Sequence, residues 1–210
     1  IITPLKQCLT ANKITELIGI VNGTTNYMLT KMTEQGMDYD TALARAQAKG
    51  YAEADPTADV SGLDAARKAA ILSSIAFNTR VSLEDVKVEG ITNITPEDIT
   101  YAKELGYIIK LLAIAKHTED GIDVRVHPTF IDKDHPLASV RNVFNAIFIH
   151  GNAVGDTMFY GKGAGERPTA SAVLADIIDV ARDMGKDRFG KIRCTCYEEK
   201  KLCPPDKVLS

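Results

Sequence analysis

The chain has 210 residues, of which 45% are hydrophobic and 25% are charged. This composition is typical of a globular protein that buries its own core, and it excludes a collagen-like, coiled-coil or largely disordered chain. The formal net charge of -3 provides no broad attraction to nucleic acid or to an anionic membrane, so we expect a small polar molecule as the partner.

The first half of the chain is predicted to be mainly helical. A short helix begins at Pro4, and the β-branched residues of 13–22 predict a strand. Helices are predicted over 24–36, 39–50 and 63–78. The acidic, turn-rich stretch 51–62 between the last two helices is predicted to be a loop.

The second half is predicted to combine hairpins with helices. Pro96 at the first helical position, after Thr95 as the N-cap, predicts a helix over 94–106. The expected strands are 107–117 and 122–131, around a turn at 118–121, and two more within 144–161. A glycine-rich loop over 161–168 leads into a helix over 169–184. We therefore expect the α+β class, with a mixed or antiparallel sheet covered by helices.

Cysteine and histidine residues do not form a metal-binding pattern. No CxxC pair is present, and no histidine stands at ligand spacing, so we predict no metal site. The cysteines are Cys8, Cys194, Cys196 and Cys203, which we expect to be reduced thiols. No apolar run reaches the ~18 residues of a membrane span and no signal peptide is apparent, which predicts a cytoplasmic protein without a membrane partner. Because the sequence opens on Ile1 rather than Met, we expect a piece of a longer protein.

An acidic cluster between two predicted helices is the most unusual feature of the sequence. It consists of Glu53, Asp55, Asp59 and Asp64, and Lys68 follows. Asp64 and Lys68 are four positions apart and therefore share one face of the helix over 63–78.

The surroundings of Lys68 leave two interpretations open. The same helix face continues through Ile71, Leu72 and Ile75, while Ser73 falls on the other side, so Lys68 is predicted to project inward. A lysine held beside carboxylates is suited to proton transfer. The alternative is an exposed ion pair that adds only a few tenths of a kcal/mol to the helix.

Two further stretches are candidates for ligand contact. In NGTTNY, 22–27, Gly23 allows a ligand to approach the backbone, and Thr24 or Thr25 either caps the next helix or binds a ligand at its N-terminus. The loop GKGAGERP also precedes a helix, but it is not GxGxxG, and no strand with an acidic residue follows about 20 positions later. The chain therefore holds no complete nucleotide-binding domain.

The stretch GYAEADPTADVSGLDAARK, 50–68, resembles the defining motif of homoserine dehydrogenases. The glycine, aromatic residue, glutamate, proline, aspartate, Gly-x-Asp and lysine follow in the same order and spacing. The segments 19–32, 135–165 and 168–182 also resemble this family, in the right order. The resemblance therefore covers nearly the whole chain.

The resemblance implies hydride transfer between NAD(P)H and aspartate 4-semialdehyde, which gives L-homoserine for threonine, methionine and isoleucine biosynthesis. It implies Lys68 as the general acid/base, with Asp64 as its catalytic neighbour. The implied substrate-binding residues are Glu53, Asp59, Tyr51, Gly23 and Thr24. Gly165 and Glu166 are implied to lie at the cofactor.

The resemblance also implies a domain organisation and a homodimer. Residues 1–184 would form the catalytic, substrate-binding and dimerisation domain, in which 163–184 return toward a nucleotide-binding domain, and 185–210 would be a linker or tail. NADP or NAD would be bound mainly by a Rossmann domain that this chain lacks, and a monovalent-cation site is expected upstream. The isolated chain is then expected to lack turnover. The alternative is a non-catalytic module for ligand binding and dimerisation.

Overall fold

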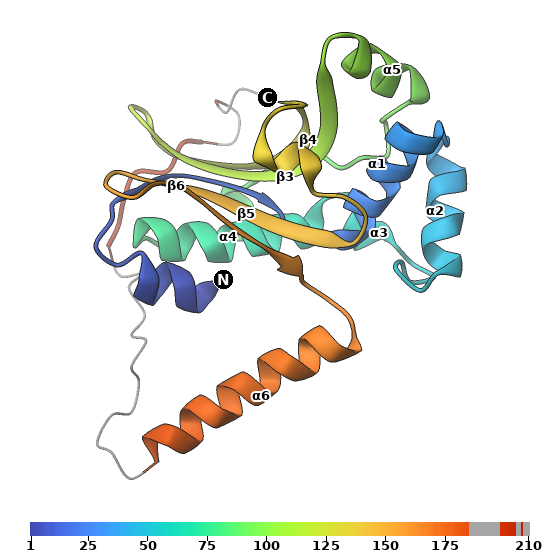
Figure 1. Ribbon diagram of the computed structural model, residues 1–210. Helices are drawn as coiled ribbons and strands as arrows, with labels where there is room; N and C mark the ends of the chain where they lie inside the picture. The colour runs from blue at the N-terminus through green and yellow to red at the C-terminus, as the bar shows by residue number, and fades with distance from the viewer. Residues whose placement is uncertain (185–197, 205–206, 208–210) are drawn as a thin grey trace.

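A six-stranded sheet forms the centre of the molecule in a computed structural model that describes residues 1–184, 198–204 and 207 (Figure 1). The strand order is β2-β4-β3-β1-β5-β6, and every pairing is antiparallel except β2 with β4. The strands are β1 Ile14–Ile20, β2 Lys87–Val88, β3 Tyr107–Thr118, β4 Gly121–Asp132, β5 Phe144–Gly151 and β6 Gly155–Lys162. The predicted mixed sheet and both predicted hairpins are confirmed.

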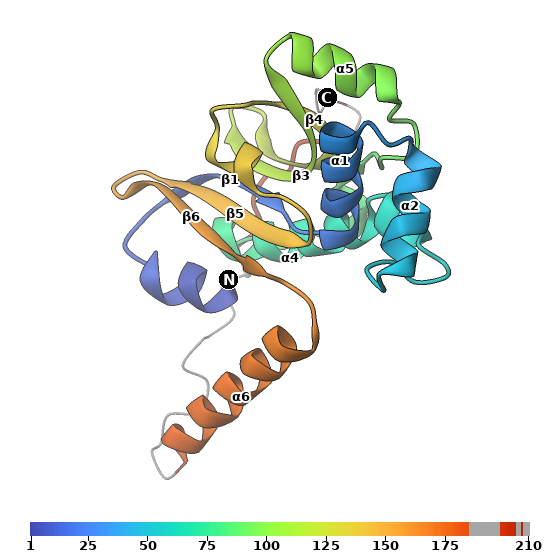
Figure 2. The same ribbon diagram turned by 45° about the vertical axis from the view of Figure 1, so that its right-hand side comes forward.

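The helices are placed at one face and at the ends of this sheet (Figures 1 and 2). They are α1 Gly23–Gln35, α2 Tyr39–Ala48, α3 Thr57–Val60, α4 Leu63–Phe77, α5 Pro96–Glu104 and α6 Glu166–Asp183. Short helices cover Pro4–Cys8, Leu83–Asp85 and Pro136–Ser139. The stretch 51–62 is not entirely a loop, because it contains α3, and the last helix begins three residues before its predicted start.

The main core lies between α4 and the sheet. Along β5 the side chains alternate, so Ile147 and Ile149 face α4 while Phe148 faces the other way. Leu17 of β1 and Leu72 of α4 are almost completely buried in the same cluster. This packing holds α4 across the strands and brings its first turn beside the end of β1 (Figure 1).

The opposite face of the sheet is only partly covered. The segment 133–143 packs Leu137 and Val140 against Leu112 and Ile20 in a second, smaller cluster. Next to this cluster, Met158 and Tyr160 of the edge strand β6 stay exposed.

Helix α6 extends away from the body in both views (Figures 1 and 2). This helix exposes large apolar side chains, namely those of Val173, Leu174, Ile177, Ile178 and Val180.

The predicted tail is described only over 198–204 and at 207, and Cys194 and Cys196 lie outside the described residues. In the described part, the backbone N–H of Ile122 donates to the carbonyl of Lys201, and that of Cys203 donates to Ile122. These residues therefore lie beside the start of β4.

Candidate active site

The candidate site is built where β1 passes into α1. The side-chain oxygen of Asn22 accepts a hydrogen bond from the backbone N–H of Thr25 at 2.9 Å and so caps α1. The prediction that Thr24 or Thr25 forms this cap is wrong, because the hydroxyl of Thr24 donates instead to the carbonyl of Tyr51 at 2.6 Å. That bond ties the start of α1 to the loop that carries the acidic residues.

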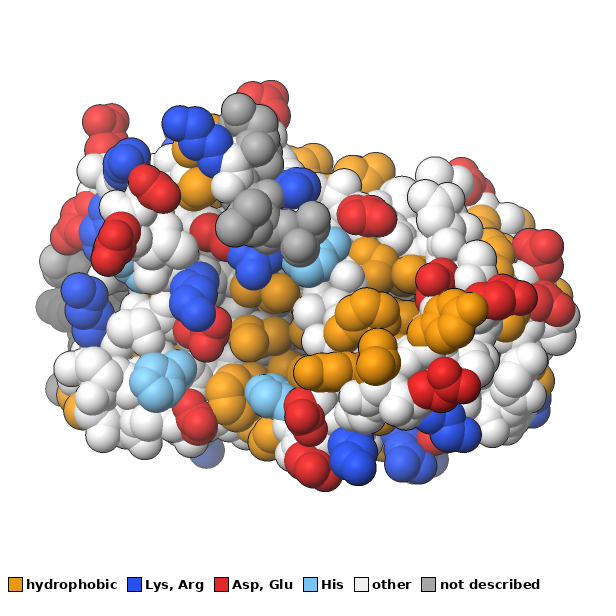
Figure 3. Space-filling model, turned by 90° about the horizontal axis from the view of Figure 1, so that it is seen from above, with side chains coloured by type: hydrophobic (Ala, Val, Ile, Leu, Met, Phe, Trp, Pro, Cys, Tyr) orange, Lys and Arg blue, Asp and Glu red, His pale blue; other side chains and the backbone are white. Residues whose placement is uncertain are grey.

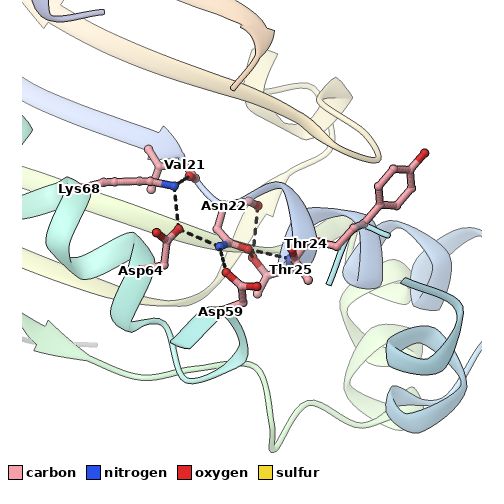
Figure 4. A network of polar contacts seen from close by, with 8 residues as sticks. Val21, Asn22, Thr24, Thr25, Asp59, Asp64 and Lys68 are labelled. Carbon is pink, nitrogen blue, oxygen red and sulfur yellow. Dashed lines mark hydrogen bonds and ion pairs between the residues drawn. The ribbon is translucent and has the colours of Figure 1, made fainter. Parts of the chain in front are cut away.

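A continuous polar network joins β1, α1, α3 and α4 (Figure 4). The amide nitrogen of Asn22 donates to Asp59 Oδ1 at 2.7 Å and to Asp64 Oδ2 at 2.8 Å. Asp64 Oδ2 also accepts from Lys68 Nζ at 2.7 Å, and Lys68 donates to the carbonyl of Val21 at 3.0 Å. The structure therefore brings together three of the predicted residues through an asparagine that was not among them.

The prediction that Lys68 projects from the inward face of α4 is wrong. Helix α4 turns small residues such as Ala65 and Ala69 toward the sheet, and Ser73, expected on the outer side, is completely buried. The side chain of Lys68 is 46% exposed, and Ile71 is 54% exposed. The small side chains allow α4 to lie close to the strands, and the face with Lys68 opens on a cavity instead.

This cavity has a volume of about 400 Å³ and collects residues from distant parts of the chain. Of the predicted site residues, those that line it are Gly23, Thr24, Tyr51, Asp59, Asp64, Lys68 and Gly165. Glu53 lines an adjoining acidic hollow of about 320 Å³, together with Tyr51, Asp59 and Asp64. Glu166 is the first residue of α6 and lines neither of the two.

The acidic hollow is lined by four carboxylates and by one guanidinium, that of Arg67. Asp55 accepts hydrogen bonds from the hydroxyl of Thr57 at 2.5 Å and from its backbone N–H at 3.0 Å. These bonds, the hydroxyl first, lower the pKa of the Asp55 carboxyl below its usual value. Asp55 therefore stays ionised, and because the carboxylates of the hollow outnumber its one guanidinium, the hollow favours a cationic group.

The cavity is also lined by residues that were not among the predicted site residues, including Asn22, Val143 and Asn145. Asn22 stands directly before a helix and has the residue type of an N-cap, so a local signal was present. No local signal marks Val143 and Asn145, because only the pairing of β5 with β1 brings them beside α1.

The wall of the cavity next to the glycine-rich loop depends on small residues. A Cβ atom on Gly163 would lie 2.1 Å from the amide nitrogen of Asn145, so a side chain cannot fit there without movement. A mostly apolar cavity of about 290 Å³ adjoins on this side and is lined by Ile1, Ile2, Val21, Lys68, Ile71, Leu72, Asn145, Ile147 and Gly163. Lys68 is the charged residue of this otherwise mostly apolar lining.

Two features are absent from the described residues. Among residues 1–184, 198–204 and 207, no group of three or more His, Cys, Asp or Glu could hold a metal ion. Within the same ranges, no helix has the length and apolar character to cross a membrane.

Comparison with known proteins gives a consistent match. The family model described as homoserine dehydrogenase matches residues 1–178. A homoserine dehydrogenase of Bacillus subtilis is 52% identical over 208 residues, which are 99% of this chain and 48% of that protein. One of Synechocystis sp. is 55% identical over 86% of this chain and 42% of its own length.

Solved structures give the same result. The crystal structure of a homoserine dehydrogenase from Thiobacillus denitrificans superposes with a TM-score of 0.88 at 46% identity, over 99% of this chain and 47% of that one. A hyperthermophilic archaeal homoserine dehydrogenase in complex with NADPH has a TM-score of 0.73 at 31% identity, over 87% of this chain and 52% of its own. The chain thus spans about half the length of its relatives, and it belongs to the homoserine dehydrogenase family.

Proposed function

We propose that this chain is the substrate-binding half of a homoserine dehydrogenase, which interconverts aspartate 4-semialdehyde and L-homoserine with NAD(P) in amino-acid biosynthesis. The observation that carries the proposal is the Lys68–Asp64–Asn22–Asp59 network on the wall of one cavity. The substrate has a reacting oxygen at one end and an α-ammonium group at the other. The ammonium group of Lys68 suits the oxygen, and the nearby carboxylates suit the α-ammonium group.

Lys68 acts on the reacting oxygen. An ammonium group has three hydrogens, and two of those on Lys68 donate to Asp64 and to the carbonyl of Val21, which leaves the third for the substrate. As the new C–H bond forms at the aldehyde carbon, the electron pair of the carbonyl moves to oxygen, and the proton of Lys68 goes to that oxygen. Asp64 keeps the ammonium group in place. In the reverse direction Lys68 takes the proton of the alcohol.

The other polar residues bind the amino-acid end of the substrate. Asp59 and Glu53 provide carboxylates for the α-ammonium group, to which charge-assisted hydrogen bonds are strong. Gly23 and Thr24 lie at the start of α1, where the helix dipole favours the substrate carboxylate. Tyr51 lines both the cavity and the hollow and closes the site from the side of α2.

NAD(P) supplies or accepts the hydride when it is bound, mainly by a nucleotide-binding half outside this chain. Within the chain, Gly165 and Glu166 join the site to α6, and we place the cofactor along this connection. The exposed apolar side chains of α6 support contact with the nucleotide-binding half, because a helix with such an apolar surface needs a partner that covers it. Residues 163–184 then return to the nucleotide-binding half.

The full protein is proposed to be a homodimer that pairs through the partly covered face of the sheet. On this face Ile18, Phe148 and Met158 lie on neighbouring strands, with Tyr160 two residues further along β6. Figure 3 shows apolar side chains in the middle of this side, between charged ones. Such a patch is typical of a surface where two copies meet. The predicted cytoplasmic location stays a prediction.

The test compares wild type with Lys68→Ala in the full-length protein, by NADPH oxidation with aspartate 4-semialdehyde as substrate. We expect kcat to fall about 100-fold or more, which is the contribution of one general acid. Lys103→Ala is the matched control, because Lys103 is exposed in the last turn of α5 and lies outside the cavity. Activity of Lys68→Ala within a few-fold of wild type would contradict the role of Lys68. Turnover by the isolated chain would contradict its dependence on a nucleotide-binding half.

A further inference from the structure

Every hydrogen-bonding position of the Asn22 side chain is used inside the candidate site. Its oxygen accepts from the N–H and from the hydroxyl of Thr25, both at 2.9 Å, and its two amide hydrogens go to Asp59 and Asp64. Asn22 is 5% exposed, so water does not compete for these positions. The capping bonds fix which end of the amide carries the hydrogens, and that end faces the two carboxylates.

We infer that Asn22 is a positioning residue, which holds Asp59 and Asp64 side by side and aims Asp64 at Lys68. This inference rests on the proposed function and adds a residue to its machinery. Oxygens of both carboxylates lie within hydrogen-bond distance of one nitrogen, where two like charges repel each other. Lys68 bonds Asp64 but not Asp59, so the amide is what draws the second carboxylate toward the first.

The three residues of this arrangement come from different secondary-structure elements. Asn22 is the N-cap of α1 and follows β1 by two residues, Asp59 lies on the single turn of α3, and Asp64 lies on the first turn of α4. A four-residue helix such as α3 has little stability of its own. A side-chain bond from Asn22 to Asp59 therefore sets where α3 presents its carboxylate.

Substitution at position 22 can separate capping from positioning. Serine and aspartate cap helices about as well as asparagine, so α1 keeps its N-cap in both Asn22→Ser and Asn22→Asp. Serine is too short to reach the carboxylates, and ionised aspartate has no hydrogen to donate. Asp38→Asn is the matched control, because it exchanges carboxylate for amide at the N-cap of α2, outside the cavity.

The experiment measures steady-state kinetics and a crystal structure of each variant in the full-length protein. We expect Asn22→Ser to lower kcat at least 10-fold and to raise the KM for aspartate 4-semialdehyde, with the KM for NADPH unchanged. Asn22→Asp should lose more, because it adds a third negative charge. A purely structural role of Asn22 would not separate the two KM values. Asp38→Asn should behave as wild type.

The crystal structure provides a readout that does not depend on turnover. In Asn22→Ser, the carboxylate of Asp59 should swing away from Asp64. Unchanged carboxylate positions would overturn the inference even if the wild type proved inactive with aspartate 4-semialdehyde. Kinetics of Asn22→Ser within two-fold of an active wild type would overturn it as well. An inactive wild type whose Asp59 does move in the variant would count against the proposed reaction and in favour of the positioning role.

Discussion

Lys110 on β3 is a buried amine that ties the far wall of the site to α1. It is 2% exposed, and its Nζ donates to Asn26 Oδ1 at 2.9 Å and to the carbonyl of Val140 at 2.6 Å. The amide of Asn26 donates in turn to the carbonyls of Asn142 and Phe144. Val143 and Asn145, which line the cavity, therefore belong to a segment fastened from behind by a lysine that does not touch the cavity.

Burial makes the stability contribution of Lys110 depend on pH. Desolvation, and secondly the charge of Arg141, lower the pKa of Lys110 from 10.5 to about 8, while Glu34 opposes the shift. Between pH 8 and 10.5 the unfolded chain therefore binds more protons at this residue than the folded chain, so stability from this group rises with pH. Below pH 8 both states are protonated and the full penalty of the buried charge applies.

Comparison of Lys110→Met with wild type tests this prediction. Methionine removes the titrating group at similar length, so the difference in unfolding free energy should move in favour of wild type from pH 8 to pH 10, by at most about 1.4 kcal/mol per pH unit. Urea unfolding at several pH values measures it, and the other lysines cancel in the difference. A constant difference over this range would show that Lys110 does not titrate as described.

At the scale of elements, the corner between α3 and α4 decides the geometry of the site. Asp59 and Asp64 stand on either side of this corner, and Gly62 turns it with a φ of +83°. The backbone N–H of Ile91 donates to the carbonyl of Val60 at 2.8 Å and holds the corner against the segment that follows β2. The acidic stretch was predicted as a loop because it is rich in turn residues. The one-turn helix α3 within it has no clear signal in the sequence, and its position depends on the hydrogen bond between Ile91 and Val60.

Gly90→Ala should displace the corner. A Cβ atom at Gly90 would lie 2.1 Å from the carbonyl oxygen of Val60 and 2.6 Å from Ser61 Cα, and these are backbone atoms that cannot rotate away. We expect a lower melting temperature and a fall in kcat, because Asp59 moves with the corner. Gly161→Ala is the control, because nothing lies within 4 Å of the added carbon. Wild-type stability and activity of Gly90→Ala would show that the corner is free to shift.

At the scale of the whole molecule, the partly covered sheet face and α6 are the two apolar surfaces that the described residues leave exposed. The face carries Ile18 and Phe148, and ion pairs such as Glu16–Lys116 border it. A monomer with this much uncovered apolar surface needs partners. The proposed partner of α6 is the nucleotide-binding half, and the proposed partner of the sheet face is a second copy of the protein.

Disruption of the sheet face should produce a monomer. Met158 is exposed and pairs with Phe148, so Met158→Asp places a charge in the middle of the proposed interface. We expect half the molar mass in sedimentation or light scattering of the full-length protein. Leu83→Asp, next to α4 on the covered side, adds the same charge elsewhere and should leave the assembly intact. A dimer that persists in Met158→Asp would exclude this face as the interface.

The sequence alone determined the class of the fold, the two hairpins and α5, together with the residues of the acidic motif. These features depend on local signals, namely runs of β-branched and apolar residues around turn residues, and the Thr95 cap, which α5 uses in a capping box with Asp98. The tertiary structure decided that Lys68 faces a cavity rather than the core and that Asn145 joins the site, whereas the Asn22 cap of α1 had a local signal in the sequence. The physical reason is that these outcomes depend on how α4 packs on the sheet and on which strand pairs with β1, and contacts between residues more than a hundred positions apart leave no local pattern.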